Sequence, residues 1–274
     1  MRNIFKVFTA IFLVLVLAAP GLAASAQQSL TEDSMISQVI KRGKLRVGLS
    51  SFVPWAMPDK TGKLIGFEID VATRLAQDLG VELELVQTEW SGIIPALLTR
   101  KFDIIIGSMS IRMDRALTVN FSEPYDYSGQ DILASKKLAA GFKSVEDFNK
   151  PNVVIALRTG ATSETAVKKY MPKAQVRFFD DESQAVQEVL VGRAHAMVSS
   201  MPLPAFQALK NLDKAFTPLH RPFTSESIAF AVRKGDPDSL NVLNTWIRIV
   251  SNQGWLEDRH QYWFNSTDWE KLLK

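Results

Sequence analysis

Short apolar runs alternate with longer amphipathic stretches along this chain, which is the pattern of an α/β protein. The runs at residues 45–49, 81–87 and 102–106 predict strands, and the third, rich in isoleucine, is typical of a strand buried on both faces. Residues 66–79 and 92–99 between them predict helices. This order of elements predicts a parallel, right-handed, doubly wound sheet, which forms a first Rossmann-like lobe.

A second lobe is predicted because the same pattern restarts after residue 130. Its expected strands and helices alternate along the chain at residues 131–135, 152–157, 164–170, 175–179, 182–191 and 196–198. Residues 100–109 also align without a gap with residues 192–201, and both segments carry Ser-Met just after an apolar run. We therefore expect each lobe to present a Ser-Met loop at the same place.

The end of the chain is predicted to return to the first lobe. Residues 225–232 alternate like a strand, and helices are expected at residues 238–253 and 255–264. The two crossings between the lobes would form a hinge beside a cleft, which suits closure on a small ligand. The expected boundaries are residues 27–130 and 226–274 for lobe 1 and residues 131–225 for lobe 2.

The first residues predict export. Arg2 and Lys6 precede an apolar run at residues 7–19, and a small-x-small pattern at residues 24–26 follows, so residues 1–26 are predicted to be a signal peptide. The apolar run is shorter than the ~20 residues that a membrane-spanning helix needs. The chain has no cysteine, which excludes disulfides, thiol catalysis and lipid attachment through cysteine. We therefore expect a monomer that is free in the periplasm.

Composition limits the partners of this chain. Its 274 residues are 46% hydrophobic and 22% charged, which is typical of a globular protein with a sizeable core. Removing residues 1–26 lowers the formal net charge from +3 to +1, because Arg2 and Lys6 are lost and no acid is. So small a charge gives no reason to expect a nucleic-acid partner.

Residues 107–115 are the candidate anchor for a ligand, because they directly follow the third apolar run. In open α/β sheets ligands collect at the carboxyl ends of strands. The guanidinium of Arg115 can hold a carboxylate by two parallel hydrogen bonds. The alternative is that Arg112 and Arg115 form a solvated helix face and pair with Asp114 or Glu123, which is the commoner role of a single arginine.

Several segments together resemble the periplasmic substrate-binding proteins of polar-amino-acid ABC importers, solute-binding protein family 3. They occur in the family's order across roughly residues 40–265, at residues 43–48, 66–70, 90–97, 107–115, 121–125 and 159–162. The resemblance implies the type II periplasmic binding protein fold, in which two lobes joined by two hinge strands close like a flytrap. It also implies a small carboxylate or amino-acid ligand, which an ABC permease in the inner membrane receives.

The same resemblance implies how the ligand's carboxylate is held. Arg115 would bind the α-carboxylate, with backbone donors near Ser110 and Thr162. Physical reasoning agrees, because Thr162 would open a helix whose free N–H groups and dipole favour an anion. Capping of its own helix is the alternative role for Thr162, and it is compatible with ligand contact.

The rest of the implied site would hold the amine and the side chain. In the family, the loop at Ser108 and an aspartate of lobe 2 bind the α-ammonium, while aromatic residues matching Phe52 and Trp90 sandwich the side chain. Core packing is the alternative for these aromatic residues. The remaining members of the expected site lie in the same loops and are Trp55, Thr159 and Ala161.

One position departs from the family's pattern. Ser200 stands where the family usually carries the aspartate that binds the ammonium. A serine hydroxyl can accept a hydrogen bond, but it cannot neutralise a buried cation, which costs several kcal/mol when unpaired. Either another group binds the amine or the ligand has none, so the hypothesis is a carboxylate-bearing ligand, either an amino acid or a related organic acid.

Two other functions are open at this point. Some proteins of this fold are cyclohexadienyl dehydratases, which this chain resembles from Gly254 to Trp263. Their general-acid glutamate is replaced here by Leu203, which cannot deliver a proton, so we expect no enzymatic activity. The histidines show no metal-ligand or triad spacing, and neither a metal nor a cofactor is expected. The other alternative is a binding protein that senses its ligand for a receptor.

Overall fold

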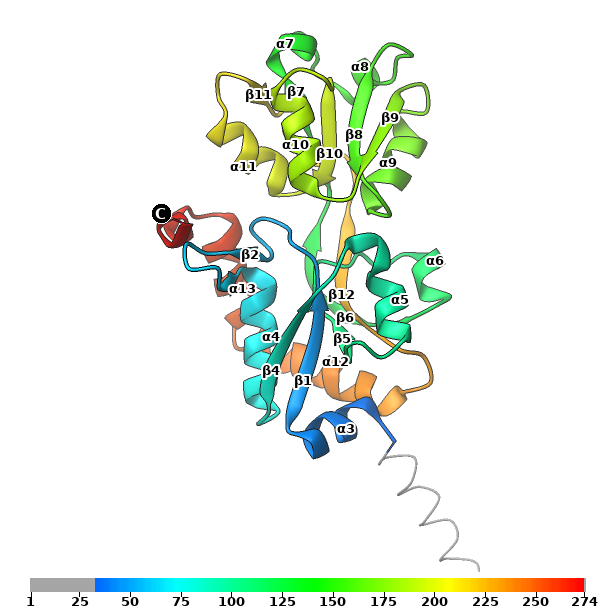
Figure 1. Ribbon diagram of the computed structural model, residues 1–274, viewed down its shortest axis with the longest axis vertical. Helices are drawn as coiled ribbons and strands as arrows, with labels where there is room; N and C mark the ends of the chain where they lie inside the picture. The colour runs from blue at the N-terminus through cyan, green and yellow to red at the C-terminus, as the bar shows by residue number, and fades with distance from the viewer. Residues whose placement is uncertain (1–32, 274) are drawn as a thin grey trace, which may run out of the picture.

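The computed structural model describes residues 33–273, which form two α/β bodies connected by two extended crossings (Figure 1). The predicted signal peptide lies outside the described residues. Lobe 1 is the body built on the sheet with strand order β4-β1-β5-β12-β6, and lobe 2 is the body built on the sheet β11-β7-β10-β8-β9. No helix within residues 33–273 is long and apolar enough to cross a membrane.

Most of the strands that form these sheets lie close to the predicted positions. Lobe 1 contains β1 (Lys44–Leu49), β4 (Glu82–Gln87), β5 (Ile104–Ile105), β6 (Asn120–Ser128) and β12 (Glu226–Val232). Lobe 2 contains β7 (Gln130–Ser135), β8 (Val154–Arg158), β9 (Gln175–Phe179), β10 (Ala196–Ser200) and β11 (Ala215–Phe216). A small antiparallel pair, β2 (Met57–Pro58) and β3 (Leu64–Ile65), lies beside lobe 1.

The three predicted strands of lobe 1 are parallel as expected, since β1 pairs in parallel with both β4 and β5, but each complete sheet is mixed. Within the described chain, β12 runs antiparallel to both of its neighbours in lobe 1, and β7 does so in lobe 2. Both strands come directly from the other lobe, so each enters its sheet from the end opposite to that used by the local strands. When lobe 1 is read from β4 and lobe 2 from β9, each sheet has two parallel strands, then a central strand, then the strand that comes from the other lobe. The central strands are β5 in lobe 1 and β10 in lobe 2. This agreement confirms the predicted repeat of residues 100–109 and 192–201.

Helices cover both faces of each sheet because successive strand residues point to opposite sides. In lobe 1, Ile104 packs in the cluster that contains the α4 residues, whereas Ile105 packs with the α5 residues. In lobe 2, Met197 packs with α10 and Val198 with α9. The main helices are α3 (Met35–Arg42), α4 (Phe67–Asp78), α5 (Ile93–Leu98), α9 (Thr162–Tyr170), α10 (Glu182–Leu190), α12 (Pro237–Asn252) and α13 (Trp255–Phe264).

Shorter elements were not predicted from the sequence. They include η1 (Trp90–Gly92), α7 (Lys136–Ala139), α8 (Val145–Phe148), α11 (Leu203–Lys210) and η2 (Asp268–Leu273). The single turn α6 (Met113–Ala116) lies where the sequence predicted a short helical stretch around Arg115. Strand β6 was also missed. It contains Pro124 and several polar residues, and it lies at the edge of its sheet, where a proline is tolerated.

The two crossings between the lobes touch each other at Gly129, which separates β6 from β7. A Cβ atom added at Gly129 would lie 2.2 Å from the carbonyl oxygen of Thr224, in the other crossing. Gln130 continues the contact, since its backbone N–H donates to the hydroxyl of Thr224 over 2.8 Å. Glycine at residue 129 therefore allows the two hinge segments to run side by side.

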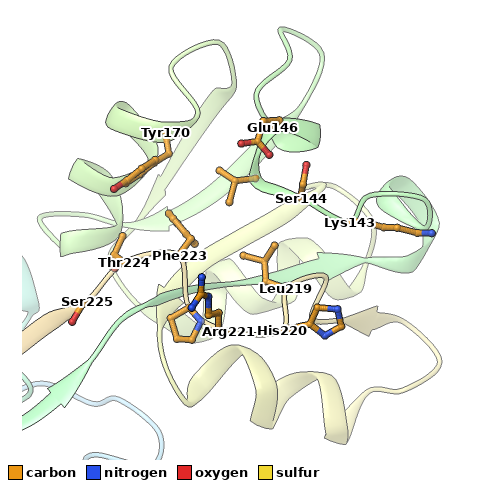
Figure 2. A pocket seen from close by; sticks show the side chains of 12 residues that line it. Lys143, Ser144, Glu146, Tyr170, Leu219, His220, Arg221, Phe223, Thr224 and Ser225 are labelled. Atoms are coloured by element: carbon orange, nitrogen blue, oxygen red, sulfur yellow. The ribbon is translucent and has the colours of Figure 1, made fainter.

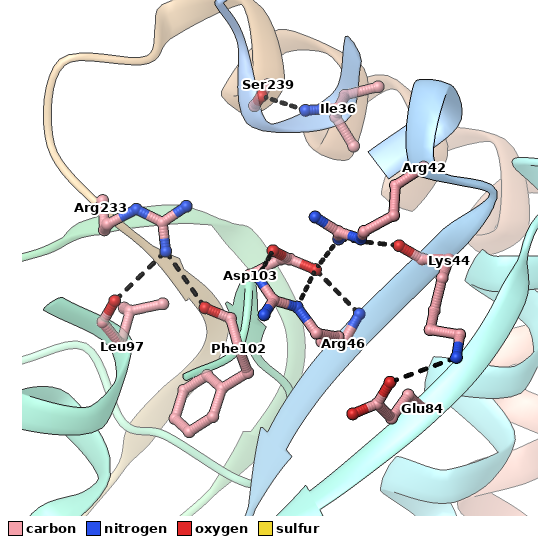
Figure 3. A network of polar contacts seen from close by, with 10 residues as sticks. All are labelled: Ile36, Arg42, Lys44, Arg46, Glu84, Leu97, Phe102, Asp103, Arg233 and Ser239. Atoms are coloured by element: carbon pink, nitrogen blue, oxygen red, sulfur yellow. Dashed lines mark hydrogen bonds and ion pairs between the residues drawn. The ribbon is translucent and has the colours of Figure 1, made fainter. Parts of the chain in front are cut away.

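Asp103 joins the start of the lobe 1 sheet to α3 (Figure 3). Its side chain is 4% exposed, forms an ion pair with Arg46 over 2.9 Å and accepts a further hydrogen bond from Arg42. The backbone N–H of Arg46 donates to the same carboxylate. Because each contact is to a charged or backbone donor, Asp103 is expected to stabilise the lobe substantially.

We predict that Asp103→Ala lowers the free energy of unfolding by about 2–4 kcal/mol, because Arg42 and Arg46 lose a shared buried partner. Urea denaturation measures the change. The matched control is Asp114→Ala, which removes an exposed carboxylate paired with Arg112 and should change stability by less than about 0.5 kcal/mol. Equal effects of the two substitutions would contradict this role for Asp103.

Candidate functional site

The Ser-Met loop of lobe 1 is fixed by a buried carboxyl group. Ser108 has a φ of 57°, in the left-handed region that a non-glycine residue rarely adopts. Its backbone N–H donates to Glu68 over 2.6 Å, and the hydroxyl of Tyr125 donates to the same carboxyl group. Glu68 comes from the first turn of α4 and is fully buried. The loop is therefore held from inside lobe 1, which leaves its outer side facing lobe 2.

Arg115 lies in α6 and is 7% exposed, so it is not part of a solvated helix face. Its Nη1 donates to the carbonyl oxygen of Ser110, and its Nη2 donates to the carbonyl oxygen of Gly160 in lobe 2, each over 3.1 Å. Arg112 instead forms the exposed pair with Asp114. Burial lowers the pKa of Arg115 to about 10, and the guanidinium stays protonated at neutral pH. Among residues 33–273, no carboxylate forms an ion pair with Arg115.

The loop before α9 brings lobe 2 against this arginine. The carbonyl oxygen of Gly160 also accepts a hydrogen bond from the indole of Trp90, over 3.2 Å. Gly160 has a φ of 72°, which favours glycine and turns the loop towards lobe 1. The hydroxyl of Thr162 donates to the hydroxyl of Ser110 over 3.2 Å. These contacts join the lobes around Arg115.

The residues beside Gly160 differ in what they touch. Thr162 is the first residue of α9, and Ala161, which is buried, occupies the N-cap position without offering a capping side chain. The first N–H groups of α9 are therefore available near Arg115. Thr159 binds within lobe 2 instead, since both its N–H and its hydroxyl donate to the carbonyl oxygen of Phe179 at the end of β9.

The aromatic residues of the expected site form two groups. Phe52 and Trp90 are each 6% exposed and lie at the junction of the lobes, where both rings face a guanidinium of lobe 2. Trp55 is 1% exposed and packs behind Phe52, with a ring-centroid distance of 6.1 Å, and it also contacts Phe67 and Phe264 of lobe 1. The structure thus places Trp55 in the core as a support for Phe52.

Ser200 belongs to a polar chain that ends on a carboxylate. Gln130 donates from Nε2 to the hydroxyl of Ser200 and to Glu226, over 2.8 Å in each case. Glu226 is 8% exposed and also accepts from the hydroxyl of Ser110, so it lies next to the loop of Arg115. Glu226 was not identified from the sequence, because it opens the return strand β12, far along the chain from Ser200. Gln130 alone therefore separates the carboxyl group of Glu226 from the hydroxyl of Ser200.

Arg158 and Glu182 were also missed from the sequence. Arg158 is the last residue of β8 and is 5% exposed, and its Nε lies 3.4 Å from a carboxylate oxygen of Glu182 at the start of α10. Burial lowers the pKa of Arg158 and raises the pKa of Glu182. A charged residue that ends an otherwise apolar strand and directly precedes the Thr159 loop was the available signal.

One of the open cavities borders this junction. One groove of about 460 Å³ is lined by Ser110 and Glu226 from lobe 1 and by Thr162 and Tyr170 from lobe 2, so it leads to the buried site. Another cavity, of about 750 Å³, belongs to lobe 2 and contains none of the expected site residues (Figure 2). Figure 2 shows its side chains spread around the rim, with no cluster of charges at its centre.

A two-lobed α/β protein with charged and aromatic groups buried between the lobes has the architecture of the type II periplasmic binding proteins. The sequence profile of the bacterial extracellular solute-binding proteins, family 3, matches residues 45–266, and the chain belongs to this family. This result and the fold confirm the resemblance described from the sequence.

Known relatives include binding proteins and one enzyme. The L-cystine-binding protein TcyJ of Escherichia coli is 29% identical over 252 residues, which cover 92% of this chain and 94% of TcyJ. The cyclohexadienyl dehydratase of Pseudomonas aeruginosa is 26% identical and covers 92% of this chain and 93% of the enzyme. A solved structure from Wolinella succinogenes, a putative binding component of an ABC transporter complexed with lysine, is 41% identical. Its TM-score is 0.79, over 84% of this chain and 99% of that chain.

The raised pKa of the buried Glu68 predicts how the free energy of unfolding changes with pH. Burial raises the pKa of Glu68 from 4.5 to about 8, so the folded chain keeps a proton that the unfolded chain releases within that range. The native protein is therefore expected to lose stability as the pH rises through this window, by up to about 1.4 kcal/mol per pH unit from this group. Glu68→Gln copies the protonated acid and should lose less.

Thermal unfolding of both proteins at several pH values between 5 and 8 measures the effect. We expect the melting temperature of the variant, relative to the native protein, to increase steadily with pH. Other titrating groups are common to both proteins and cancel in this difference. Curves that stay parallel over the whole range would show that Glu68 does not carry the buried proton.

Proposed function

We propose that this protein captures an α-amino acid between its lobes and delivers it to an ABC importer. The observation that carries the proposal is the state of Arg115, which is buried at the lobe junction with only neutral carbonyl oxygens as hydrogen-bond acceptors. A carboxylate is a stronger acceptor for a guanidinium than a carbonyl oxygen. The ligand's α-carboxylate would therefore bind Arg115 and the N-terminus of α9 together, and this double contact would hold the lobes closed.

Glu226 is the group that we propose for the ligand's ammonium. It lies beside Ser110 and is connected to Ser200 through Gln130, so it faces the same region as the missing family aspartate. A buried ammonium needs a carboxylate partner, which Glu226 can supply. This proposal favours an amino acid over an amine-free organic acid. Phe52 and Trp90 would lie along the ligand's side chain.

The proposed location is the periplasm, after export by the predicted signal peptide. Membership of an extracellular solute-binding family supports this location. The proposed partners are the permease subunits of an inner-membrane ABC importer, with the protein acting as a monomer. Because several related proteins are named as binding proteins or binding components of ABC transporters, uptake is preferred over sensing for a receptor.

The similarity to cyclohexadienyl dehydratase supports an enzyme as the second candidate. The position of the expected general acid is Leu203, which is 2% exposed at the start of α11 and carries no proton to transfer. The buried acids that face the site are engaged, Glu226 by hydroxyl and amide donors and Glu182 by Arg158. We therefore propose binding without catalysis. Turnover of prephenate or arogenate by the purified protein would instead favour the enzyme.

Arg115→Ala is predicted to abolish ligand binding while the protein still folds. In a thermal-shift screen of amino acids and carboxylates, a ligand at 100 times its dissociation constant should raise the melting temperature of the native protein by about 5–10 °C. The variant should show no shift with the same ligand, and Arg115→Lys should bind at least about tenfold more weakly, because lysine cannot form the two-pronged contact.

The matched control is Arg248→Ala, which removes an exposed arginine of lobe 1 that pairs with Glu123. Its ligand-induced shift should equal that of the native protein. Circular dichroism checks that each variant is folded. A full shift with Arg115→Ala would mean that another group holds the carboxylate.

Glu226→Gln is predicted to remove the preference for an amine. The native protein should bind an α-amino acid at least about tenfold more tightly than the corresponding deaminated or keto acid, because only the former pairs with Glu226. The variant should bind the two compounds with similar affinity. Calorimetry with both compounds measures the ratio. A ratio that is unaffected by the substitution would exclude Glu226 as the partner of the amine.

A further inference from the structure

Arg158 reaches from lobe 2 to the aromatic residues of lobe 1. Its guanidinium carbon lies 5.1 Å from the centre of the Phe52 ring and 4.8 Å from the Trp90 ring. Contacts at this distance attract a cation to each ring. The place beside both rings, which could accept a cationic ligand side chain, is therefore already taken by a cation of the protein itself.

Arg158 and Glu182 leave both a donor and an acceptor without a partner. The Nη1 and Nε groups of Arg158 and the Oε2 atom of Glu182 have no hydrogen-bond partner within the described chain, although both residues are over nine-tenths buried. Buried polar atoms in native proteins are normally paired, and an unpaired one is costly. A bound group that accepts from Arg158 and donates to Glu182 would satisfy both residues.

The charges of the site limit what that group can be. In the proposed complex, Arg115 pairs with the ligand's carboxylate and Glu226 with its ammonium, while Arg158 pairs with Glu182. A further positive charge on the ligand would face Arg158, and a further negative charge would face Glu182. In a buried site either charge would lack a partner. The balance therefore favours a side chain without net charge.

We propose that the site selects amino acids whose side chain ends in a paired acceptor and donor with no net charge, bound by Arg158 and Glu182. This inference rests on the proposed function and adds its specificity. A carboxamide is such a group, as in glutamine, with its acceptor and donor on separate atoms. The zwitterionic second end of a double amino acid, as in cystine, offers the same pairing with a carboxylate and an ammonium. Cationic side chains are rejected by Arg158 and anionic ones by Glu182.

Calorimetry with the native protein tests this specificity directly. The panel contains L-glutamine and L-cystine against L-lysine, L-arginine, L-glutamate and L-leucine. We expect glutamine or cystine to bind at least tenfold more tightly than every other compound, and comparing these two separates the carboxamide from the zwitterionic end. Tightest binding of lysine, arginine, glutamate or leucine would overturn the inference.

Two single substitutions should change the specificity in opposite directions. Arg158→Leu leaves Glu182 free beside the aromatic rings, so lysine and arginine should gain at least tenfold relative to glutamine. Glu182→Gln leaves Arg158 without a negative partner, so glutamate should gain at least tenfold relative to glutamine. If neither ratio changes, Arg158 and Glu182 do not contact the ligand and the inference is wrong.

A second pair in the same lobe provides matched controls. Arg177 and Glu188 are also 3.4 Å apart, but Arg177 is half exposed on the surface. Arg177→Leu and Glu188→Gln should leave the ranking of ligands unchanged. If either single variant of the buried pair fails to fold, the double variant Arg158→Leu with Glu182→Leu removes both charges. It should lose binding of glutamine and cystine at least tenfold relative to leucine, and unchanged relative affinities would count against the inference.

The outcomes separate this inference from the proposed function. Binding of lysine or glutamate that Arg115→Ala abolishes would leave amino-acid capture intact and overturn only the role of Arg158 and Glu182. Binding of none of the panel would overturn the specificity, and binding of no amino acid in the wider thermal-shift screen would contradict the proposed function as well.

Discussion

Burial of charge at the junction of the lobes is the constraint on which this structure depends. Arg115 and Arg158 come from different lobes, and both lie within 5.5 Å of the centre of the Trp90 ring. Closing the lobes removes water from these guanidiniums, and a desolvated charge needs an opposite charge or strong acceptors. A closed state is therefore stable to the degree that the enclosed partners match the charges. Under the proposed function, this requirement would convert recognition of a ligand into closure of the protein.

The topology explains why these groups meet. Both sheets use the same strand order, and each receives one antiparallel strand from the other lobe. The Ser-Met loops that follow the central strands β5 and β10 consequently face each other across the hinge. The hinge itself is narrow, since Gly129 brings the two crossings into contact. Small rotations at this contact would move the loops of one lobe towards or away from the other.

The main elements could be predicted because their local signals agree with the fold. Helix α13 and strand β9 have the predicted bounds, and α4 ends before Gly80, whose φ is 69°. Strand β6 could not be predicted, because its polar residues and Pro124 are acceptable only at a sheet edge that pairing with β12 creates.

The site was predictable only in part. Arg115 was found because it follows a buried strand in a recognisable loop. Glu226 and Glu182 lie 26 and 18 positions from Ser200 in the chain, and only tertiary packing brings Glu226 into the polar chain of Gln130 and Ser200. Arg158 lay between the expected strand at residues 152–157 and the expected loop at residues 159–163, and it was assigned to neither. Charged residues that become neighbours only when two lobes pack together have no characteristic spacing in the sequence.

Moving the amine's partner from lobe 2 to the hinge changes what pulls the lobes together. An aspartate at the position of Ser200 would attach the ammonium to lobe 2, whereas Glu226 belongs to the strand β12 of lobe 1. In the proposed complex the ligand's ammonium and its bond to Arg115 both attach it to lobe 1. The contacts that attach it to lobe 2 are then those with Gly160, with Thr162 and with the pair of Arg158 and Glu182. Closure then depends on the ligand's carboxylate and side chain rather than on its amine, because these are the groups that lobe 2 contacts. A ligand whose side chain cannot satisfy Arg158 and Glu182 would bind lobe 1 without closing the protein, and selection among amino acids would occur at the closing step.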